Sequence, residues 1–236
     1  MIQVTNLHKK FGKTQVLDNL DLDIDGGGIF AILGPNGSGK TTLIKSILGM
    51  VIMDKGSISV LGNAIKTNWN YRKEVNYLPQ IANFPGNLKV RELVKMIVDL
   101  RQKPNRADEL IELFKLQDFL DKKLTTLSGG TKQKVNIVLS FMFDSPLLIL
   151  DEPTTGLDPL ALINLKKLIQ EEKNRGKTIL VTSHILQFVE EVADEIVYLL
   201  EGKIYFKGNL SQLKSKTKQT DIEHAIAAIA TQSQHA

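Results

Sequence analysis

The sequence predicts an α/β fold built around a parallel sheet, and three observations support this prediction. Short apolar runs without polar alternation recur along the chain, as in strands that helices cover on both faces. Stretches of helical length with recognisable stop signals separate these runs. Of the 236 residues, 42% are hydrophobic and 24% are charged, which excludes collagen-like, coiled-coil and wholly disordered chains.

Six strands are expected, in two groups. The first two strands alternate apolar and polar residues, as in an antiparallel layer with one face in water. The other four are short and β-like, and three of them are apolar without alternation, so they belong to the parallel sheet. The antiparallel group covers residues 2–7 and 16–24, and the parallel group covers residues 29–33, 75–78, 147–150 and 178–182.

Helices are expected between these strands. A glycine or a proline follows each of the three clearest helical stretches, and both residues are common helix stops. Apolar residues also recur at helical spacing in a region without any strand signal, which predicts a small helical insert. The three helices cover residues 40–48, 130–143 and 159–175, and the insert covers about 84–123.

The end of the chain has a different character. After Leu213 the sequence turns polar, and three isoleucines then recur at i, i+4 and i+7 between residues 222 and 229. We therefore expect a domain over residues 1–213, followed by a short linker and a terminal helix over residues 214–236.

Composition and charge narrow the function. The chain has 30 Lys and Arg against 26 Asp and Glu, a net charge of +4, so bulk charge predicts no nucleic-acid partner. The lack of cysteine excludes a disulfide framework, a thiolate nucleophile and cysteine-ligated zinc. The first residues do not read as a signal peptide, and no run approaches the ~20 apolar residues of a membrane span. We expect a cytoplasmic chain whose membrane role depends on a partner.

A glycine-rich loop carries the strongest functional signal. It follows the strand at 29–33 directly and opens a helix. Such glycines let backbone N–H groups converge on a phosphate at the positive end of the helix. In this pattern Lys40 reaches the β- and γ-phosphates and Thr41 can hold Mg²⁺. A simple glycine turn would match by chance in about 1% of chains or fewer. The predicted nucleotide site comprises Gly34, Asn36, Gly37, Ser38, Gly39, Lys40, Thr41 and Thr42.

Two carboxylates end the apolar strand at 147–150. Asp151 could complete the Mg²⁺ shell through water, and Glu152 could orient or deprotonate the attacking water, which are the two needs of metal-assisted phosphoryl transfer. By itself, Asp-Glu-Pro after a strand is equally consistent with a turn and a helix cap. The glycine-rich loop shifts the balance strongly towards catalysis.

Further motifs, in order along the chain, make residues 2–213 resemble the ATP-binding-cassette (ABC) ATPases. Alone, a Leu-Ser-Gly-Gly run would be little more than a helix N-terminus, and a lone histidine is more often a core or surface residue. The resemblance implies an ABC ATPase fold: a RecA-like parallel core of the P-loop NTPase type, an N-terminal antiparallel β layer and an α-helical subdomain. The matching residues are Gln80, Leu127-Ser128-Gly129-Gly130, Gly156-Leu157-Asp158 and Ser183-His184.

The resemblance also implies a head-to-tail homodimer around two ATP–Mg²⁺. The signature helix of one subunit, starting at Ser128, Gly129 and Gly130, would bind the γ-phosphate held by the other, and a helix N-terminus suits an anion. His184 would position the attacking water or Glu152 and would act in catalysis with Lys40. The remaining implied roles are a Mg²⁺ contact for Gln80 beside Thr41 and Asp151, coupling of the two sites for Asp158, and adenine stacking for Phe11.

Isolated cassettes of this family usually drive a separate membrane subunit. The resemblance therefore implies an ABC-2 type permease as partner and a peripheral position on the cytoplasmic face of the cell membrane. Residues 80–91 would line the groove for the permease, although Phe84 and Leu88 fit an ordinary core equally well.

Three stretches, at 77–85, 127–135 and 183–194, resemble the ATPase subunit (NosF type) of the transporter that helps to mature the copper sites of nitrous oxide reductase. A periplasmic copper-maturation protein would then be an indirect partner. Other ABC-2 exporters, of drugs, lipids or polysaccharides, and a gliding-motility ATPase remain alternatives. A soluble ABC ATPase without a transport role is a further one.

Overall fold

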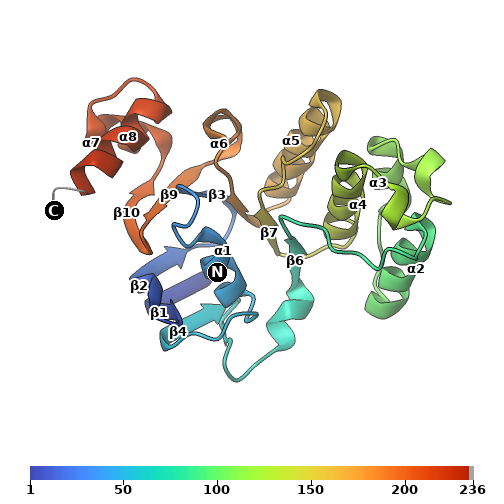
Figure 1. The fold of residues 1–236 in the computed structure, drawn as a ribbon, viewed down its shortest axis with the longest axis horizontal. Helices are drawn as coiled ribbons and strands as arrows, with labels where there is room; N and C mark the ends of the chain where they lie inside the picture. Colours follow the sequence, from blue (N-terminus) through green and yellow to red (C-terminus); the bar gives the residue numbers. More distant parts are fainter. Residues whose placement is uncertain (234–236) are drawn as a thin grey trace.

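Two β-sheets form the scaffold of residues 1–233, the part of the chain that the computed structural model describes (Figure 1). The expected terminal segment runs to residue 236, and its residues 234–236 lie outside the described part. The larger sheet has the order β10-β9-β3-β8-β7-β6 and the smaller one the order β2-β1-β4-β5. The strands are β1 (Ile2–Phe11), β2 (Thr14–Ile24), β3 (Gly28–Leu33), β4 (Lys55–Val60), β5 (Asn63–Ala64), β6 (Val75–Leu78), β7 (Leu147–Asp151), β8 (Thr178–Thr182), β9 (Glu195–Leu200) and β10 (Lys203–Gly208).

Strand directions follow the two predicted groups. In the larger sheet β6, β7, β8, β3 and β9 run parallel, and only the edge strand β10 is antiparallel to its neighbour. All pairings in the smaller sheet are antiparallel. The helices are α1 (Lys40–Ile47), α2 (Val90–Arg101), α3 (Ala107–Leu113), α4 (Gly129–Phe141), α5 (Pro159–Asn174), α6 (Leu186–Val192), α7 (Leu210–Thr217) and α8 (Ile222–Ser233).

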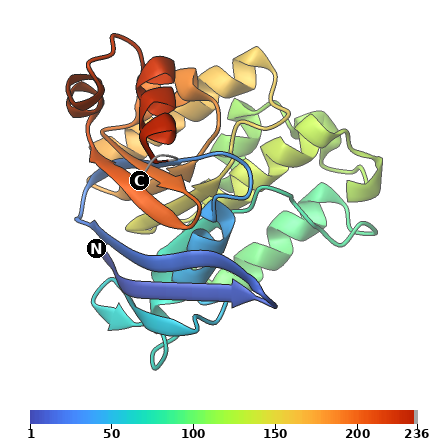
Figure 2. The same ribbon diagram turned by 60° about the vertical axis from the view of Figure 1, so that its left-hand side comes forward.

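Strand β3 shows why the central strands are apolar on both faces. Phe30 and Ile32 belong to a core shared with the antiparallel sheet and α1. Ile29, Ala31 and Leu33 alternate with them and belong to a second core, shared with α4, α5 and α6. Because neighbouring strand residues point to opposite faces, one short run supplies both cores. Figure 2 shows the antiparallel strands (blue) on one side of the central sheet and the later helices on the other.

The predicted helical region is confirmed as helical. Residues 84–123 contain α2 and α3, and their buried faces pack with α4 into the second core. These three helices form a lobe at one side of the sheet (Figure 1). Helix α2 begins without an acceptor side chain at Lys89, and the Lys89 N–H is bound instead by Glu92 Oε2 at 2.8 Å. This bond is half of a capping box, because an ammonium group cannot accept a hydrogen bond.

Four strands escaped the prediction, and they form two hairpins. The turn Leu61-Gly62 joins β4 to β5, and the turn Glu201-Gly202 joins β9 to β10. In each turn both residues have positive φ, 52° and 75° in the first and 48° and 77° in the second. Two-residue turns of this kind match the twist of paired strands. A glycine in second position between two apolar runs is the sequence signal that could have revealed them.

The expected linker after residue 213 is partly helical, which corrects that prediction. Asn209 caps α7: its Oδ1 accepts from the Gln212 N–H at 2.8 Å, and its own N–H donates to Gln212 Oε1 at 2.9 Å. This reciprocal pair lets α7 begin early and run to Thr217 despite its polar sequence.

The terminal helix itself is confirmed as α8. Ile222, Ala225 and Ile229 are buried in the second core, so α8 docks against the rest of the molecule. It lies beside α7, beyond the end of β10 (Figure 1). Within residues 1–233, no helix combines the length and the apolarity that crossing a bilayer requires.

Candidate functional site

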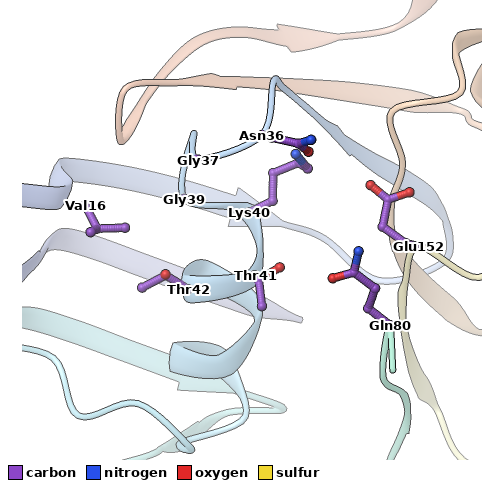
Figure 3. A pocket seen from close by; sticks show the side chains of 9 residues that line it. All are labelled: Val16, Asn36, Gly37, Gly39, Lys40, Thr41, Thr42, Gln80 and Glu152. Atoms are coloured by element: carbon purple, nitrogen blue, oxygen red, sulfur yellow. The ribbon is translucent and has the colours of Figure 1, made fainter. Parts of the chain in front are cut away.

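A pocket of about 370 Å³ opens where β3 ends and the glycine-rich loop leads into α1 (Figure 3). Ligands of parallel α/β sheets bind at this carboxyl edge of the strands. Eight of the predicted site residues line the pocket, together with one residue that sequence reasoning missed, Val16 of β2. The predicted lining residues are Asn36, Gly37, Gly39, Lys40, Thr41, Thr42, Gln80 and Glu152.

The loop backbone lies too close to its neighbours for side chains at two glycines. A Cβ atom at Gly34 would lie 2.1 Å from the Leu199 carbonyl oxygen, and one at Gly39 would lie 2.9 Å from the Val16 carbonyl oxygen. Gly39 also has φ +106°, a conformation that only glycine adopts readily. The glycines therefore allow the loop to pack against β2 and β9 at the floor of the pocket.

Lys40 is buried at the bottom of this loop, with only 7% of its surface exposed. Its Nζ donates hydrogen bonds to the carbonyl oxygens of Gly34 at 2.7 Å and Pro35 at 3.1 Å. Burial lowers the pKa of Lys40, while the nearby carboxylates of Glu152 and Asp151 act in the opposite direction. Its two hydrogen-bond partners are neutral, so the ammonium group is suited to receiving an anion.

Asp151 ends β7 and is fixed by the neighbouring strand. The Thr182 hydroxyl, at the end of β8, donates to Asp151 Oδ1 at 2.5 Å. Burial raises the pKa of Asp151, and the charge of Glu152 raises it further against the effects of Thr182, Lys45 and Lys40. Burial, with the charge of Asp151, also raises the pKa of Tyr77 to about 12. A carboxylate stripped of water in this way gains from a cation nearby.

Glu152 follows in an unusual backbone conformation. Its φ is +49°, in the left-handed region that costs a non-glycine residue about 1–2 kcal/mol. The Glu152 N–H donates to Thr182 Oγ1 at 3.0 Å, which helps to hold this conformation. The side chain is nearly buried, and its Oε2 lies 2.8 Å from Nδ1 of the exposed His184. Strained backbone of this kind concentrates at functional sites. In Figure 3 the Glu152 carboxylate faces the pocket opposite Lys40.

The signature residues lie elsewhere, at the start of α4. Ser128 caps this helix, because its Oγ accepts from the Thr131 N–H at 3.2 Å. A Cβ at Gly130 would lie 2.5 Å from the Gly156 carbonyl oxygen, whereas one at Gly129 would meet nothing within 4 Å. Neither Ser128 nor the two glycines line the pocket. Within one chain this segment is a capped helix start with an open outer face.

Asp158 and Phe11 also lie outside the pocket lining. Asp158 caps α5 through the Ala161 N–H at 2.8 Å, and its Oδ2 pairs with Lys134 Nζ of α4 at 2.6 Å. The bond from Lys134 holds the pKa of Asp158 below its usual range. Phe11 ends β1 with 51% of its surface exposed, and Lys9 Nζ lies 5.2 Å from the centre of its ring. Both residues have local partners, and their predicted roles at the nucleotide remain predictions.

Comparison with known proteins identifies the family. The family model described as "ABC transporter" matches residues 17–155. The chain is 33% identical to the bacitracin transport ATP-binding protein BcrA of Bacillus licheniformis, over 93% of this chain and 73% of that one. It is 35% identical to the lantibiotic transport ATP-binding protein SrtF of Streptococcus pyogenes, over 86% and 89%. It is 33% identical to the Nod factor export ATP-binding protein I of Burkholderia lata, over 88% and 70%.

Solved structures share the same architecture. An ATP-binding subunit of an ABC transporter matches with a TM-score of 0.90 and 29% identity, over 98% of this chain and 99% of that one. The dimeric post-hydrolysis state of the ATP-binding cassette MJ0796, bound to ADP and Pi, matches with a TM-score of 0.78 and 25% identity, over 89% and 99%. The predicted ABC ATPase fold is thereby confirmed. The chain belongs to the ATP-binding subunits of ABC transporters, which bind ATP and couple its hydrolysis to transport.

Proposed function

We propose that the chain is the ATP-hydrolysing subunit of an ABC exporter, in which two copies enclose two ATP–Mg²⁺ head to tail and drive a separate permease. The observation that carries the proposal is the division of the site. Lys40 and Glu152 line one pocket, and His184 contacts Glu152. The helix start at Ser128 lies outside that lining, with open space beside Gly129. A second copy would supply the missing wall.

The residues present fit ATP and Mg²⁺. The buried Ser38 hydroxyl has no hydrogen-bond partner among the described residues. Lys40 donates its hydrogen bonds to two neutral carbonyl oxygens. Phosphate oxygens would satisfy both groups. Thr41, Gln80 and Asp151 offer the hard oxygen ligands that Mg²⁺ prefers. When bound, Mg²⁺ would neutralise charge on the phosphate oxygens.

The Glu152–His184 pair would orient and deprotonate the attacking water. We assign Nδ1 of His184 as the donor in the 2.8 Å contact with Glu152 Oε2, because a carboxylate oxygen accepts. This tautomer leaves Nε2 of His184 free to accept a hydrogen bond. Glu152 keeps its second carboxylate oxygen for a proton from water, as a general base requires.

Membership of the family supports our proposals for the permease and the cellular position. We place the chain peripherally on the cytoplasmic face of the membrane, with an ABC-2 type permease docked near residues 80–91. Phe84 and Leu88 are partly buried against the second core, which supports the core interpretation for these two side chains. We also retain the proposed division into an ATPase domain over residues 1–213, with its helical subdomain at about 84–123, and a terminal segment from 214.

Export is favoured over other transport roles by the names of the relatives, which concern bacitracin and lantibiotic transport and Nod factor export. A NosF-type role in copper-site maturation, with its periplasmic partner, stays a prediction from short motif stretches alone. An ABC exporter of a compound of the bacitracin, lantibiotic or Nod factor type is therefore the assignment that we propose.

The test uses the purified chain with ATP and Mg²⁺. Wild type should release phosphate and associate, as followed by phosphate release and analytical ultracentrifugation. Glu152→Gln should lower turnover at least about 100-fold, the contribution expected of a general base, and should accumulate an ATP-dependent dimer. Glu171→Gln, an exposed position on α5, is the matched control and should behave as wild type. Continued turnover in Glu152→Gln would remove Glu152 from the catalytic role.

A further inference from the structure

Helix α4 joins the signature residues to the loops behind the pocket. Four residues along one face of α4 contact the segments that follow β6 and β7. Gly130 lies against Gly156, and Lys134 pairs with Asp158 at 2.6 Å. Between these contacts, the buried side chains of Gln133 and Asn136 reach the two loops nearest the pocket.

The two amides form one continuous hydrogen-bond relay. Asn136 Nδ2 donates to the Pro79 carbonyl oxygen at 2.9 Å and lies 3.4 Å from Gln133 Oε1. Gln133 Nε2 donates to the Pro153 carbonyl oxygen at 3.0 Å. Gln133 is 5% exposed and Asn136 is 2% exposed, so water does not compete for these bonds.

The two carbonyl groups are placed next to the pocket residues. Pro79 precedes Gln80, and Pro153 follows Glu152. Both prolines lie beyond the last residues of their strands, β6 and β7, where the sheet no longer fixes the backbone. Strands β6 and β7 are direct neighbours. The relay therefore joins the two loops at the point where the hydrogen bonds between β6 and β7 stop. It also gives hydrogen-bond partners to polar groups that are buried there.

We propose that Gln133 and Asn136 are positioning residues, whose amide relay fixes Gln80 and Glu152 relative to each other and to the helix start at Ser128. The inference rests on the proposed function, because it assigns these loops to catalysis. Through the relay, a displacement of the signature helix is transmitted to both pocket residues together. Small displacements of groups that must align with a reacting phosphate are costly in rate.

A purely structural role for the relay is the alternative, and a second buried polar pair provides the control. Ser145 Oγ donates to Asn76 Oδ1 at 3.0 Å, and Asn76 Nδ2 donates to the Phe143 carbonyl oxygen at 2.8 Å. This pair joins β6 to the loop between α4 and β7, and Ser145 precedes β7, at the end of the strand remote from the pocket. Ser145→Ala should therefore lower stability without an effect on catalysis.

The experiment compares Gln133→Met, Asn136→Ala, their double variant and Ser145→Ala in the full chain. For each protein, thermal unfolding, ATP affinity and turnover at saturating ATP are measured. We expect turnover of the relay variants to fall about tenfold or more, with ATP affinity within about twofold of wild type because the glycine-rich loop is untouched. Since the relay acts as a unit, the double variant should lose about as much turnover as either single variant.

The possible outcomes separate the alternatives. Wild-type turnover in Gln133→Met or in Asn136→Ala would overturn the inference, as would a loss of turnover in Ser145→Ala matching that of the relay variants at equal melting temperature. If one relay variant does not fold, the other decides. If wild type itself neither hydrolyses ATP nor associates, the proposed function fails, whereas active wild type with unaffected relay variants refutes the relay alone.

Discussion

The pocket and the signature helix, the two regions that the family resemblance assigns to one nucleotide, are built in opposite ways. In the pocket, Lys40 and Glu152 are buried, their backbones are constrained, and each is held by named partners. At the signature helix, Ser128 makes only a local cap and a Cβ at Gly129 would meet open space. The pocket is formed within a single chain, whereas the open face of the signature helix has no contact partner there among the described residues. We therefore expect that one chain binds the nucleotide in a first step and that a second copy closes over it in a separate step.

The largest effect should come from the pocket. Lys40→Met removes a charged donor to the phosphates, and charged hydrogen bonds contribute about 1.5–3 kcal/mol. We expect ATP affinity of the isolated chain to fall about 10- to 100-fold, as measured by titration calorimetry. Lys55→Met, at an exposed position of β4, should leave affinity unchanged. An equally tight Lys40→Met variant would show that this lysine is not part of the phosphate cradle.

The matching change at the signature helix should leave ATP binding to one chain intact. Gly129→Ala adds a methyl group to open space and supports the helix, so folding should be preserved. If a second copy approaches this face, ATP-driven dimerisation on the Glu152→Gln background should weaken about tenfold, a change of about 1.4 kcal/mol. Sedimentation would measure it. Undiminished dimerisation would mean that the open face is not the closing surface.

Gly130→Ala provides the contrast on the same helix. Its added Cβ would lie 2.5 Å from the Gly156 carbonyl oxygen, so the backbone before Asp158 must move. Hence this variant should lose thermal stability where Gly129→Ala does not. Equal melting temperatures for the two variants would contradict the close packing of α4 against this loop.

A smaller effect is expected at Phe11. Stacking of an aromatic side chain on a base contributes about 1–3 kcal/mol, and the half-exposed position of this ring favours the lower end. Phe11→Ala should weaken ATP binding about fivefold, and Phe11→Tyr, which keeps the stacking face, should match wild type. Competition titrations with a ribose triphosphate that lacks the base would check whether stacking causes the difference in affinity. That ligand should bind wild type and both variants equally.

The smallest effect concerns stability and pH. Burial raises the pKa of Asp151 above its ordinary 3.8, so the charged carboxylate disfavours the folded state. The penalty is absent below about pH 3.8, develops between that pH and the raised pKa, and is complete above the raised pKa. Asp151→Asn should therefore melt at a higher temperature than wild type at pH 7, and the gap should close near pH 4. A gap that is constant with pH would show that the charge of Asp151 is not its cause.

The sequence was sufficient to select candidate site residues where the chemistry requires particular residues next to each other in the chain. The loop at 34–42 and the Asp151-Glu152 pair are local patterns, and most of these residues line one pocket. Val16 was missed because it reaches the pocket from β2, a strand of the smaller sheet, and nothing in an apolar β-branched residue marks that position. The Gln133–Asn136 relay was missed for a similar reason, because its acceptors are backbone carbonyls of distant loops.

The fold shows the same division. Apolar runs predicted the buried strands, since burial on both faces leaves a continuous signal. Strand β10 and helix α7 are short and rich in lysine, so their sequences read as loop, and pairing with β9 and the Asn209 cap decide their structure instead. A neighbouring strand decides the structure of β10, whereas a local capping box decides that of α7.

The left-handed backbone at Glu152 has a consequence for the evolution of such chains. Replacement by glycine or asparagine would relieve the conformational cost at the same moment as it removed the carboxylate. If Glu152 is the general base that we propose, substitutions that abolish hydrolysis here would also relieve backbone strain. A gene copy no longer selected for turnover would then be expected to accumulate them. Screens that reward heat resistance alone would enrich the same inactive variants.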